Sequence, residues 1–205
     1  MIIPFRKFAG GALETNAYCI KAPKGTILFD APEGADRHFI SEHINLLLLT
    51  HGHFDHIIDA ACIRRRHHCQ IGIHAESAPM LSQPGFFRDW ESAVEIETIQ
   101  PDFLVTDATR TSLLGLDFQI FLIPGHCPGS LCFLVQPDGP LFCGDVLFRG
   151  GVGRWDLPEG SQSVLLEGIH RQLATLPEGV VVYPGHGPPT TIGYEKKHNP
   201  FLNPL

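Results

Sequence analysis

The 205-residue chain has no uninterrupted apolar stretch approaching the ~20 residues that a membrane-spanning helix needs. Its first residues, MIIPFRKFAG, also lack the longer apolar core of a secretion signal. Basic residues are in deficit, because 15 Lys and Arg against 22 Asp and Glu give a net charge of -7. Such a chain lacks the basic surface that phosphate neutralisation requires. We therefore expect a cytoplasmic protein with neither nucleic acid nor a membrane as a partner.

The six cysteines form no CxxC pair and show no close, regular spacing, which argues against a zinc ribbon and against a disulfide scaffold. We expect them to be mostly buried free thiols. No internal repeat of fixed period is visible, and no low-complexity linker divides the chain. With 43% hydrophobic and 18% charged residues the composition is that of a globular protein. We expect one domain over residues 1–205.

Glycine and proline are plentiful, with 21 and 17 residues, and they cut the chain into short runs rich in Ile, Val, Leu and Phe. Apolar residues at spacings of three and four predict helices over residues 36–44, 56–67 and 163–176. The order suits the α/β class, with two mixed sheets packed face to face and helices outside. Strands are predicted over residues 1–8, 16–22, 26–31, 44–50, 70–74, 117–123, 130–136, 140–144 and 179–185.

The stretch from Ser82 to Arg110 has the least regular pattern in the chain. Long irregular loops in compact domains are often functional, and this one carries three large aromatic residues. Two interpretations stay open: the aromatic residues form a lid over a site, or they pin the loop to the core. They are Phe86, Phe87 and Trp90.

A cluster of ligand-type side chains follows the apolar run in LLLLTHGHFDHIID, residues 46–59. His51 and His53 stand one residue apart, so both imidazoles can hold the same ion, and Gly52 allows a tight turn between them. Asp55 and His56 follow at once and would face a second ion. Four ligands in six residues are too many for one catalytic zinc, which usually takes three protein ligands.

Three downstream motifs share one architecture, in which an apolar run and a turn are followed by a metal-binding side chain. They are FLIPGHCPGS with His126, LFCGD with Asp145, and VVVYPGHG with His186. Each predicted strand thus delivers one ligand to the same edge of a sheet.

Seven ligands suit a site for two divalent metal ions. Asp145 would bridge, because the two oxygens of a carboxylate can span ions ~3.5 to 4 Å apart. Asp55 and Asp145 are also the candidate catalytic carboxylates. Imidazole with carboxylate favours zinc and also admits iron or manganese. His51, His53 and His126 would hold the first ion, and Asp55, His56 and His186 the second.

Asp30 in TILFDAP also ends an apolar strand. It is either a turn former or the acceptor of a hydrogen bond from a ligand histidine, as carboxylates behind metal ligands commonly are.

THGHFDH together with His126, Asp145 and His186 resembles the metallo-β-lactamase superfamily over nearly the whole chain. The resemblance implies the αββα sandwich. Within that superfamily, PGHCPGS, GDVLFRGGVGRWDLPEGS and YPGHGPPTTIGYEKKHNPFL are similar to the hydroxyacylglutathione hydrolases, or glyoxalase II enzymes, in their short bacterial form. Cys127 stands where that group usually has threonine, and the separate C-terminal helical domain of the longer enzymes is not expected here.

The resemblance implies hydrolysis of a thioester by a metal-bridging hydroxide, with S-D-lactoylglutathione as substrate and D-lactate and glutathione as products. The partner would be a small glutathione conjugate, and the chain a monomer or small homo-oligomer. Candidates for holding an anionic substrate are Arg154, Tyr194, Lys196 and Lys197, unless Arg154 braces its loop and the lysines are solvated.

Three other activities stay open. One is hydrolysis of another thioester or of a lactone. Another is a dioxygenase acting on glutathione persulfide with one iron, for which His51, His126 and Asp145 would supply the ligands. The last is a non-catalytic binding module, which the intact ligand set disfavours.

Overall fold

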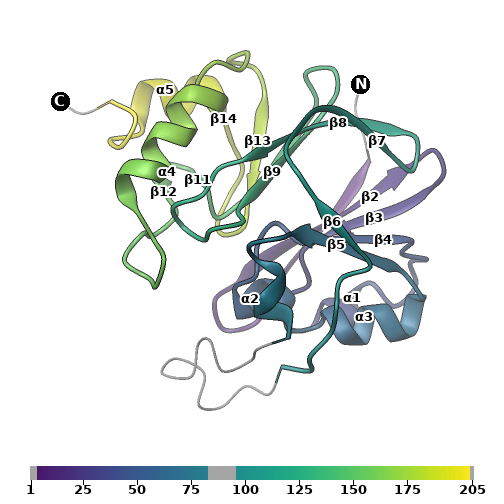
Figure 1. Cartoon of the computed structure of the whole chain (residues 1–205). Coiled ribbons are helices and arrows are strands. Elements are labelled where there is room, and N and C mark those ends of the chain that lie inside the picture. The colour runs from purple at the N-terminus through teal and green to yellow at the C-terminus, as the bar shows by residue number, and fades with distance from the viewer. Residues whose placement is uncertain (1–3, 83–95, 204–205) are drawn as a thin grey trace.

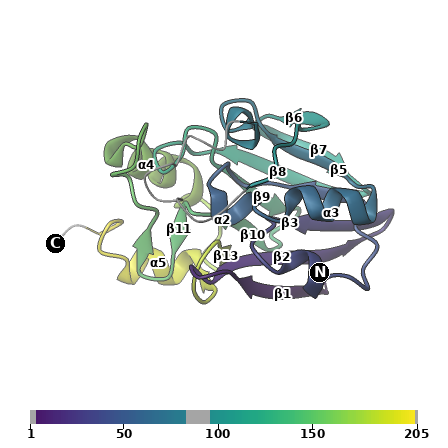
Figure 2. The same ribbon diagram turned by 90° about the horizontal axis from the view of Figure 1, so that it is seen from below.

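The computed structural model of the chain describes residues 4–82 and 96–203. Four layers follow one another, with helices on the outside and two six-stranded sheets between them (Figures 1 and 2). The predicted αββα sandwich of two mixed sheets is therefore confirmed. No helix in the described ranges has the length and apolar character to cross a membrane.

The first sheet has the order β1-β2-β3-β4-β5-β6, antiparallel up to β3 and parallel from β3 onward. Its outer face carries the short α1, Ala35–His38, and α3, Ala60–His67. The strands are β1 Phe5–Gly10, β2 Thr15–Ala22, β3 Gly25–Phe29, β4 Leu46–Leu48, β5 Gln70–His74 and β6 Phe103–Val105.

The second sheet has the order β14-β13-β10-β9-β8-β7, in which only β10 and β13 run parallel. The helices α4, Gln162–Gly168, and α5, Ile192–His198, lie on its side of the sandwich (Figure 1). The strands are β7 Ala108–Leu113, β8 Leu116–Leu122, β9 Leu131–Val135, β10 Leu141–Gly144, β13 Val181–Pro184 and β14 Thr190–Thr191.

Short elements complete the described chain. A 3-10 turn follows β5, and a π-helical turn extends α4. A hairpin of two short strands, two residues each, follows β10. The short helix α2 carries two of the predicted metal ligands. These elements are η1 Ala78–Leu81, η3 Ile169–Leu173, β11 Leu147–Phe148, β12 Gly151–Val152 and α2 Phe54–Ile57.

Three hydrophobic clusters fill the three interfaces between the layers. The strand β4 shows why its sequence is a continuous run of leucines: Leu47 packs with the helix-side cluster, whereas Leu46 and Leu48 pack between the sheets. In β9 likewise, Phe133 faces the other sheet and Leu134 faces the cluster beside α4. A strand covered on both faces needs apolar residues at every position.

Several predicted elements need correction. Residues 39–44 form no helix, although Phe39 and Ile44 are fully buried as their spacing indicated. The predicted helix over residues 56–67 is two helices, and the backbone amide of Asp59, between them, donates to the carbonyl of Ala31 at 2.9 Å. The helix predicted over residues 163–176 is confirmed up to Leu173, as α4 with its π-helical extension, whereas residues 174–176 form a turn and a bend.

The region from Ser82 to Arg110 is less irregular than predicted. It contains β6, and β7 begins inside it, so its described part adds an edge strand to each sheet. The three aromatic residues of the predicted lid, Phe86, Phe87 and Trp90, lie outside the described residues. The helix α5 and the strands β11, β12 and β14 were not predicted.

Candidate metal centre

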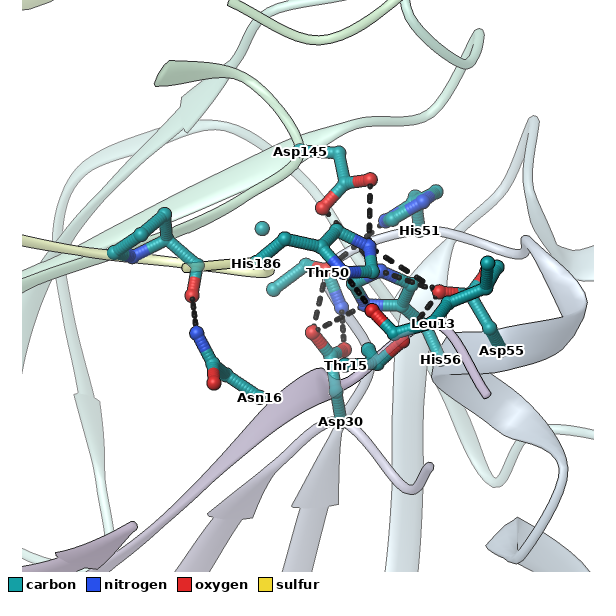
Figure 3. A network of polar contacts seen from close by, with 12 residues as sticks. Leu13, Thr15, Asn16, Asp30, Thr50, His51, Asp55, His56, Asp145 and His186 are labelled. Atoms are coloured by element: carbon teal, nitrogen blue, oxygen red, sulfur yellow. Dashed lines mark hydrogen bonds and ion pairs between the residues drawn. The ribbon is translucent and has the colours of Figure 1, made fainter. Parts of the chain in front are cut away.

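The predicted ligands follow strand ends at one edge of the sandwich. His51 and His53 come just after β4, and Asp55 and His56 lie in α2, which starts directly after them. From the other sheet, Asp145 follows β10. His126 stands between β8 and β9, and His186 comes two residues after β13. Figure 3 shows several of these side chains converging from both sheets.

The structure brings all seven predicted ligands together. Their possible ligand atoms form three overlapping groups, within each of which the atoms lie no more than 4.8 Å apart. His51 and His126 approach closely, with 3.3 Å between their Nε2 atoms. The groups are His51, His53 and His126; His51, His56 and Asp145; and Asp55, His56 and His186.

Asp145 lies between two halves of the cluster. The first half is His51, His53 and His126, and the second half is Asp55, His56 and His186. Its Oδ2 is 3.5 Å from Nε2 of His126 and 3.3 Å from Nε2 of His186. Its Oδ1 is 3.3 Å from Nε2 of His56. This placement is what a bridging carboxylate needs.

His51, His56, His126 and His186 are anchored through Nδ1, which turns Nε2 toward the cluster. His126 donates to the carbonyl of Arg154 at 2.8 Å, and His186 donates to the carbonyl of Leu13 at 2.9 Å. Such partners fix the tautomer and ring orientation of a metal-binding histidine.

Asp30 anchors the other two. Its Oδ2 accepts from Nδ1 of His56 at 2.8 Å and from the hydroxyl of Thr50 at 2.8 Å. The same Thr50 oxygen lies 3.0 Å from Nδ1 of His51. Asp30 is buried and has a φ of 59°, but no turn is assigned at this residue. The contacts confirm the second interpretation, in which Asp30 accepts a hydrogen bond from a predicted ligand histidine.

Burial is the main influence on the pKa values of the three histidines in the first half, His51, His53 and His126. Desolvation lowers the pKa of His51, of His126 and of His53, the last to about 3. Neutral imidazole is the form that binds a metal, so these three are ready to act as ligands.

The second half is ion-paired. Burial alone would lower the pKa of His186, but the carboxylates of Asp145 and Asp55 outweigh it and raise that pKa to about 10. The pKa of His56 is also raised, by Asp55 and Asp145 against its own burial. Burial opposes ionisation of Asp55, yet His56 and His186 bring its pKa down to about 2.

Two glycines allow the strand ends to approach the cluster. A Cβ on Gly185 would lie 2.0 Å from Oδ1 of Asp145, and a Cβ on Gly144 would lie 2.4 Å from Oγ1 of Thr50. Gly144 also has a φ of 46°, which glycine adopts without strain. Neither position tolerates a side chain without moving the site.

The donor set fits divalent cations. Nε2 of His56 and Oδ1 of Asp145 are buried and have no hydrogen-bond partner among the described residues. These two atoms lie 3.3 Å apart, and such a buried pair is costly unless a cation or proton sits between them. Imidazole and carboxylate together are suitable ligands for zinc, iron or manganese.

Each predicted substrate residue has a contact within the protein. The guanidinium of Arg154 makes two 2.8 Å hydrogen bonds to Asp156. Lys197 lies 3.2 Å from Glu178. The ring of Tyr194 lies under the guanidinium of Arg149 at 5.0 Å. For Lys196, the carbonyl accepts from the side chain of Asn203.

Four supporting groups escaped the sequence analysis. Thr50 and Thr15 hydrogen bond to the site through their hydroxyls, and the carbonyls of Leu13 and Arg154 orient His186 and His126. Thr50 could have been noticed, because it directly precedes the ligand run. The other contacts join residues far apart in the chain, and a backbone carbonyl has no sequence signature.

Comparison with known proteins agrees with this geometry. The model of the metallo-β-lactamase superfamily matches residues 10–186. A "Probable metallo-hydrolase YqgX" of Bacillus subtilis is 33% identical, covering 97% of each chain. "Hydroxyacylglutathione hydrolase GloC" of Haemophilus influenzae is 36% identical, covering 78% of this chain and 77% of its own.

Two solved structures are similar over nearly their full lengths. One, described as BLEG-1 B3 metallo-β-lactamase, is 36% identical with a TM-score of 0.89, covering 97% of this chain and 99% of its own. The other, TTHA1623 in a di-iron-bound form, is 32% identical with a TM-score of 0.86, covering 96% and 100%. The chain belongs to the metallo-β-lactamase superfamily.

Proposed function

We propose that the chain is a dinuclear metal-dependent thioester hydrolase that converts S-D-lactoylglutathione to D-lactate and glutathione. The metallo-hydrolase class follows from the family and from the His/Asp cluster, and the thioester substrate is the new element. The observation that carries the proposal is the position of Asp145, whose Oδ2 lies within 3.5 Å of a histidine from each half of the cluster.

In this proposal His51, His53 and His126 hold one ion, Asp55, His56 and His186 hold the other, and Asp145 binds both. When bound, the ions supply a hydroxide nucleophile near neutral pH and polarise the thioester carbonyl. The chain keeps the first three imidazoles neutral by burying them. It fixes the direction of the ligands through Asp30, Thr50 and the carbonyls behind the histidines.

The leaving group decides which acyl compounds suit such a site. A thiol with a pKa of ~8.5 departs as thiolate and needs no strong acid beside it, whereas an amide nitrogen needs a proton. Burial opposes ionisation of Asp55 and Asp145, but the neighbouring histidines lower the pKa of both carboxyl groups. Ionised carboxylates are poor proton donors, which supports a thioester over an amide as the substrate class. The name of the Haemophilus relative supports the same class.

Contacts of the substrate with Arg154, Tyr194, Lys196 and Lys197 stay predictions. Arg154 and Lys197 already have carboxylate partners in Asp156 and Glu178, so an anionic substrate would have to displace these.

Hydrolysis of a β-lactam is a second candidate, favoured by the similarity to the structure described as a B3 metallo-β-lactamase. Oxidation of glutathione persulfide at one iron is a weaker rival. It would leave Asp55, His56 and His186 without a role, although the structure gathers their ligand atoms within 4.8 Å.

The test is a turnover assay on protein reconstituted with zinc, manganese or iron. S-D-lactoylglutathione, other acyl thioesters, a lactone, a β-lactam and glutathione persulfide with oxygen monitoring form the panel. We expect thioester hydrolysis that is lost in Asp145→Asn. The matched control is Asp138→Asn, an exposed residue before the other end of β10. Preferred turnover of the β-lactam or the persulfide would replace the proposal, and no turnover at all would reject it.

A further inference from the structure

We propose that Thr15 is a positioning residue for the half of the metal centre formed by Asp55 and His186, an inference that rests on the proposed dinuclear site. Thr15 is the first residue of β2 and is fully buried. Its hydroxyl donates a 2.5 Å hydrogen bond to Oδ2 of Asp55, forty residues along the chain. Figure 3 shows Thr15 close to Asp55 within the polar network.

The same turn that leads into Thr15 also holds His186. The carbonyl of Leu13 accepts from Nδ1 of His186 at 2.9 Å, and Thr15 forms an isolated β-bridge with His186. Next along the chain, the amide of Asn16 donates to the carbonyl of Gly185 at 2.7 Å. One short segment of the first sheet therefore fixes a carboxylate from α2 and an imidazole from the second sheet against each other.

The hydroxyl is the kind of partner that a metal-binding carboxylate keeps. Oδ2 of Asp55 also lies 3.3 Å from Nε2 of His186 and 3.5 Å from Nε2 of His56, so it faces the other two predicted ligands of the same ion. The Thr15 hydroxyl reaches this oxygen from β2, outside the predicted ligand set, and so fixes the orientation of the carboxylate from behind.

The other half of the centre is held by different groups. Thr50 and the carbonyl of Arg154 are the hydrogen-bond partners of His51 and His126. Loss of the Thr15 hydroxyl should therefore weaken the binding of one ion and leave the other nearly unchanged. Loss of a group that orients a metal ligand typically weakens metal affinity about 10- to 100-fold.

The experiment is a zinc titration of metal-free protein against a chromophoric chelator, which gives two stepwise dissociation constants. Thr15→Val removes the hydroxyl at nearly constant volume, Thr15→Ala removes it without risk of a clash, and Thr15→Ser keeps it. In Val and Ala variants we expect one constant to rise about 10-fold or more and the other to change less than about threefold. The Ser variant should match the wild type, and circular dichroism checks the fold of each.

The outcomes separate the two proposals. Two ions bound by the wild type with both constants unchanged in Thr15→Val or Thr15→Ala would overturn the role of Thr15 alone. The role of Thr15 would also be overturned if both dissociation constants rose equally, or if Thr15→Ser weakened zinc binding as much as Thr15→Val does. In either case altered packing would explain the effect. A wild type that binds only one ion would overturn the dinuclear site itself.

Discussion

Asp30 accepts a hydrogen bond from His56 across 2.8 Å in the protein interior, and the same carboxylate oxygen accepts from Thr50. One buried carboxylate thereby sets the orientation of two predicted ligands, His56 directly and His51 through Thr50. These two predicted ligands are thus held by the residue that follows β3, the strand that runs parallel to β4.

Asp30→Asn should weaken metal binding without unfolding the protein. Asparagine tolerates the φ of 59° at this position, but its NH2 group replaces one of two accepting oxygens. Oδ1 of Asp30 accepts from the backbone amide of Thr50, and Oδ2 accepts from His56 and from the Thr50 hydroxyl, so one of these contacts is lost. We expect about 10- to 100-fold weaker metal affinity, measured by retention of zinc against a chelator. Asp102→Asn is the matched control, because Asp102 pairs with Arg64 outside the site, and it should retain metal as the wild type does. Equal retention in all three proteins would contradict the role of Asp30.

Gly185→Ala should disable the centre while sparing the fold. The added Cβ would lie 2.0 Å from Oδ1 of Asp145 and 2.7 Å from Cε1 of His56, so both ligands would have to move. Misplacement of catalytic groups by about 1 Å can cost on the order of 100-fold in rate. Gly179→Ala, before the other end of β13, meets nothing within 4 Å and should leave turnover unchanged. An active Gly185→Ala variant would show that the glycine is dispensable.

All six cysteines are free thiols, and Cys62 should react with an alkylating agent faster than the other five. Cys62 is partly exposed, whereas the others are buried, and burial raises their pKa. A raised pKa means less thiolate at pH 8, and the thiolate is the reactive form. Mass spectrometry after brief iodoacetamide treatment of native protein should find Cys62 modified first. Equally fast modification of Cys127, next to His126, would show that the site is more open than described.

His67 should make the protein less stable as the pH falls. Burial lowers the pKa of His67 below its ordinary value of 6.5. Between the folded-state pKa and pH 6.5, the unfolded chain therefore binds more protons than the folded one. The stabilisation is present above pH ~6.5 and is lost as the pH falls through the folded-state pKa. Urea unfolding at pH 7.5 and 5.5 should show a larger loss for the wild type than for His67→Gln. The same loss in both proteins would assign the pH dependence to other groups.

The sequence predicted the parts of the fold that depend on local pattern. The apolar run around Leu46–Leu48 predicts a strand buried on both faces, as β4 is. The first predicted ligands come shortly after this run in the sequence. By contrast, α5 is capped at its N-terminus by Thr191, whose hydroxyl accepts from the amide of Tyr194, and polar residues dominate the sequence of this helix. Short edge strands such as β6 depend on pairing with a distant partner, which no local pattern reveals.

In the candidate site, the ligands could be predicted from local sequence, whereas the groups that orient them could not. The predicted ligands could be picked out because four ligand-type residues stand within six positions after an apolar run, and three further apolar runs each lead to one more. Their supports were not, because Leu13 and His186 are 173 residues apart and meet only when the two sheets stack. The guanidinium of Arg154, predicted for the substrate, pairs with Asp156, while its carbonyl orients His126.

The measurement that tests the central claim most directly is the metal content per chain of the purified protein after saturation and removal of free metal. The account predicts two divalent ions per chain in the wild type and a clear loss in Asp145→Asn, because Oδ2 of Asp145 lies within 3.5 Å of both His126 and His186. Asp138→Asn should keep both ions. A wild type that holds a single ion, or an Asp145→Asn variant that still holds two, would contradict the dinuclear centre.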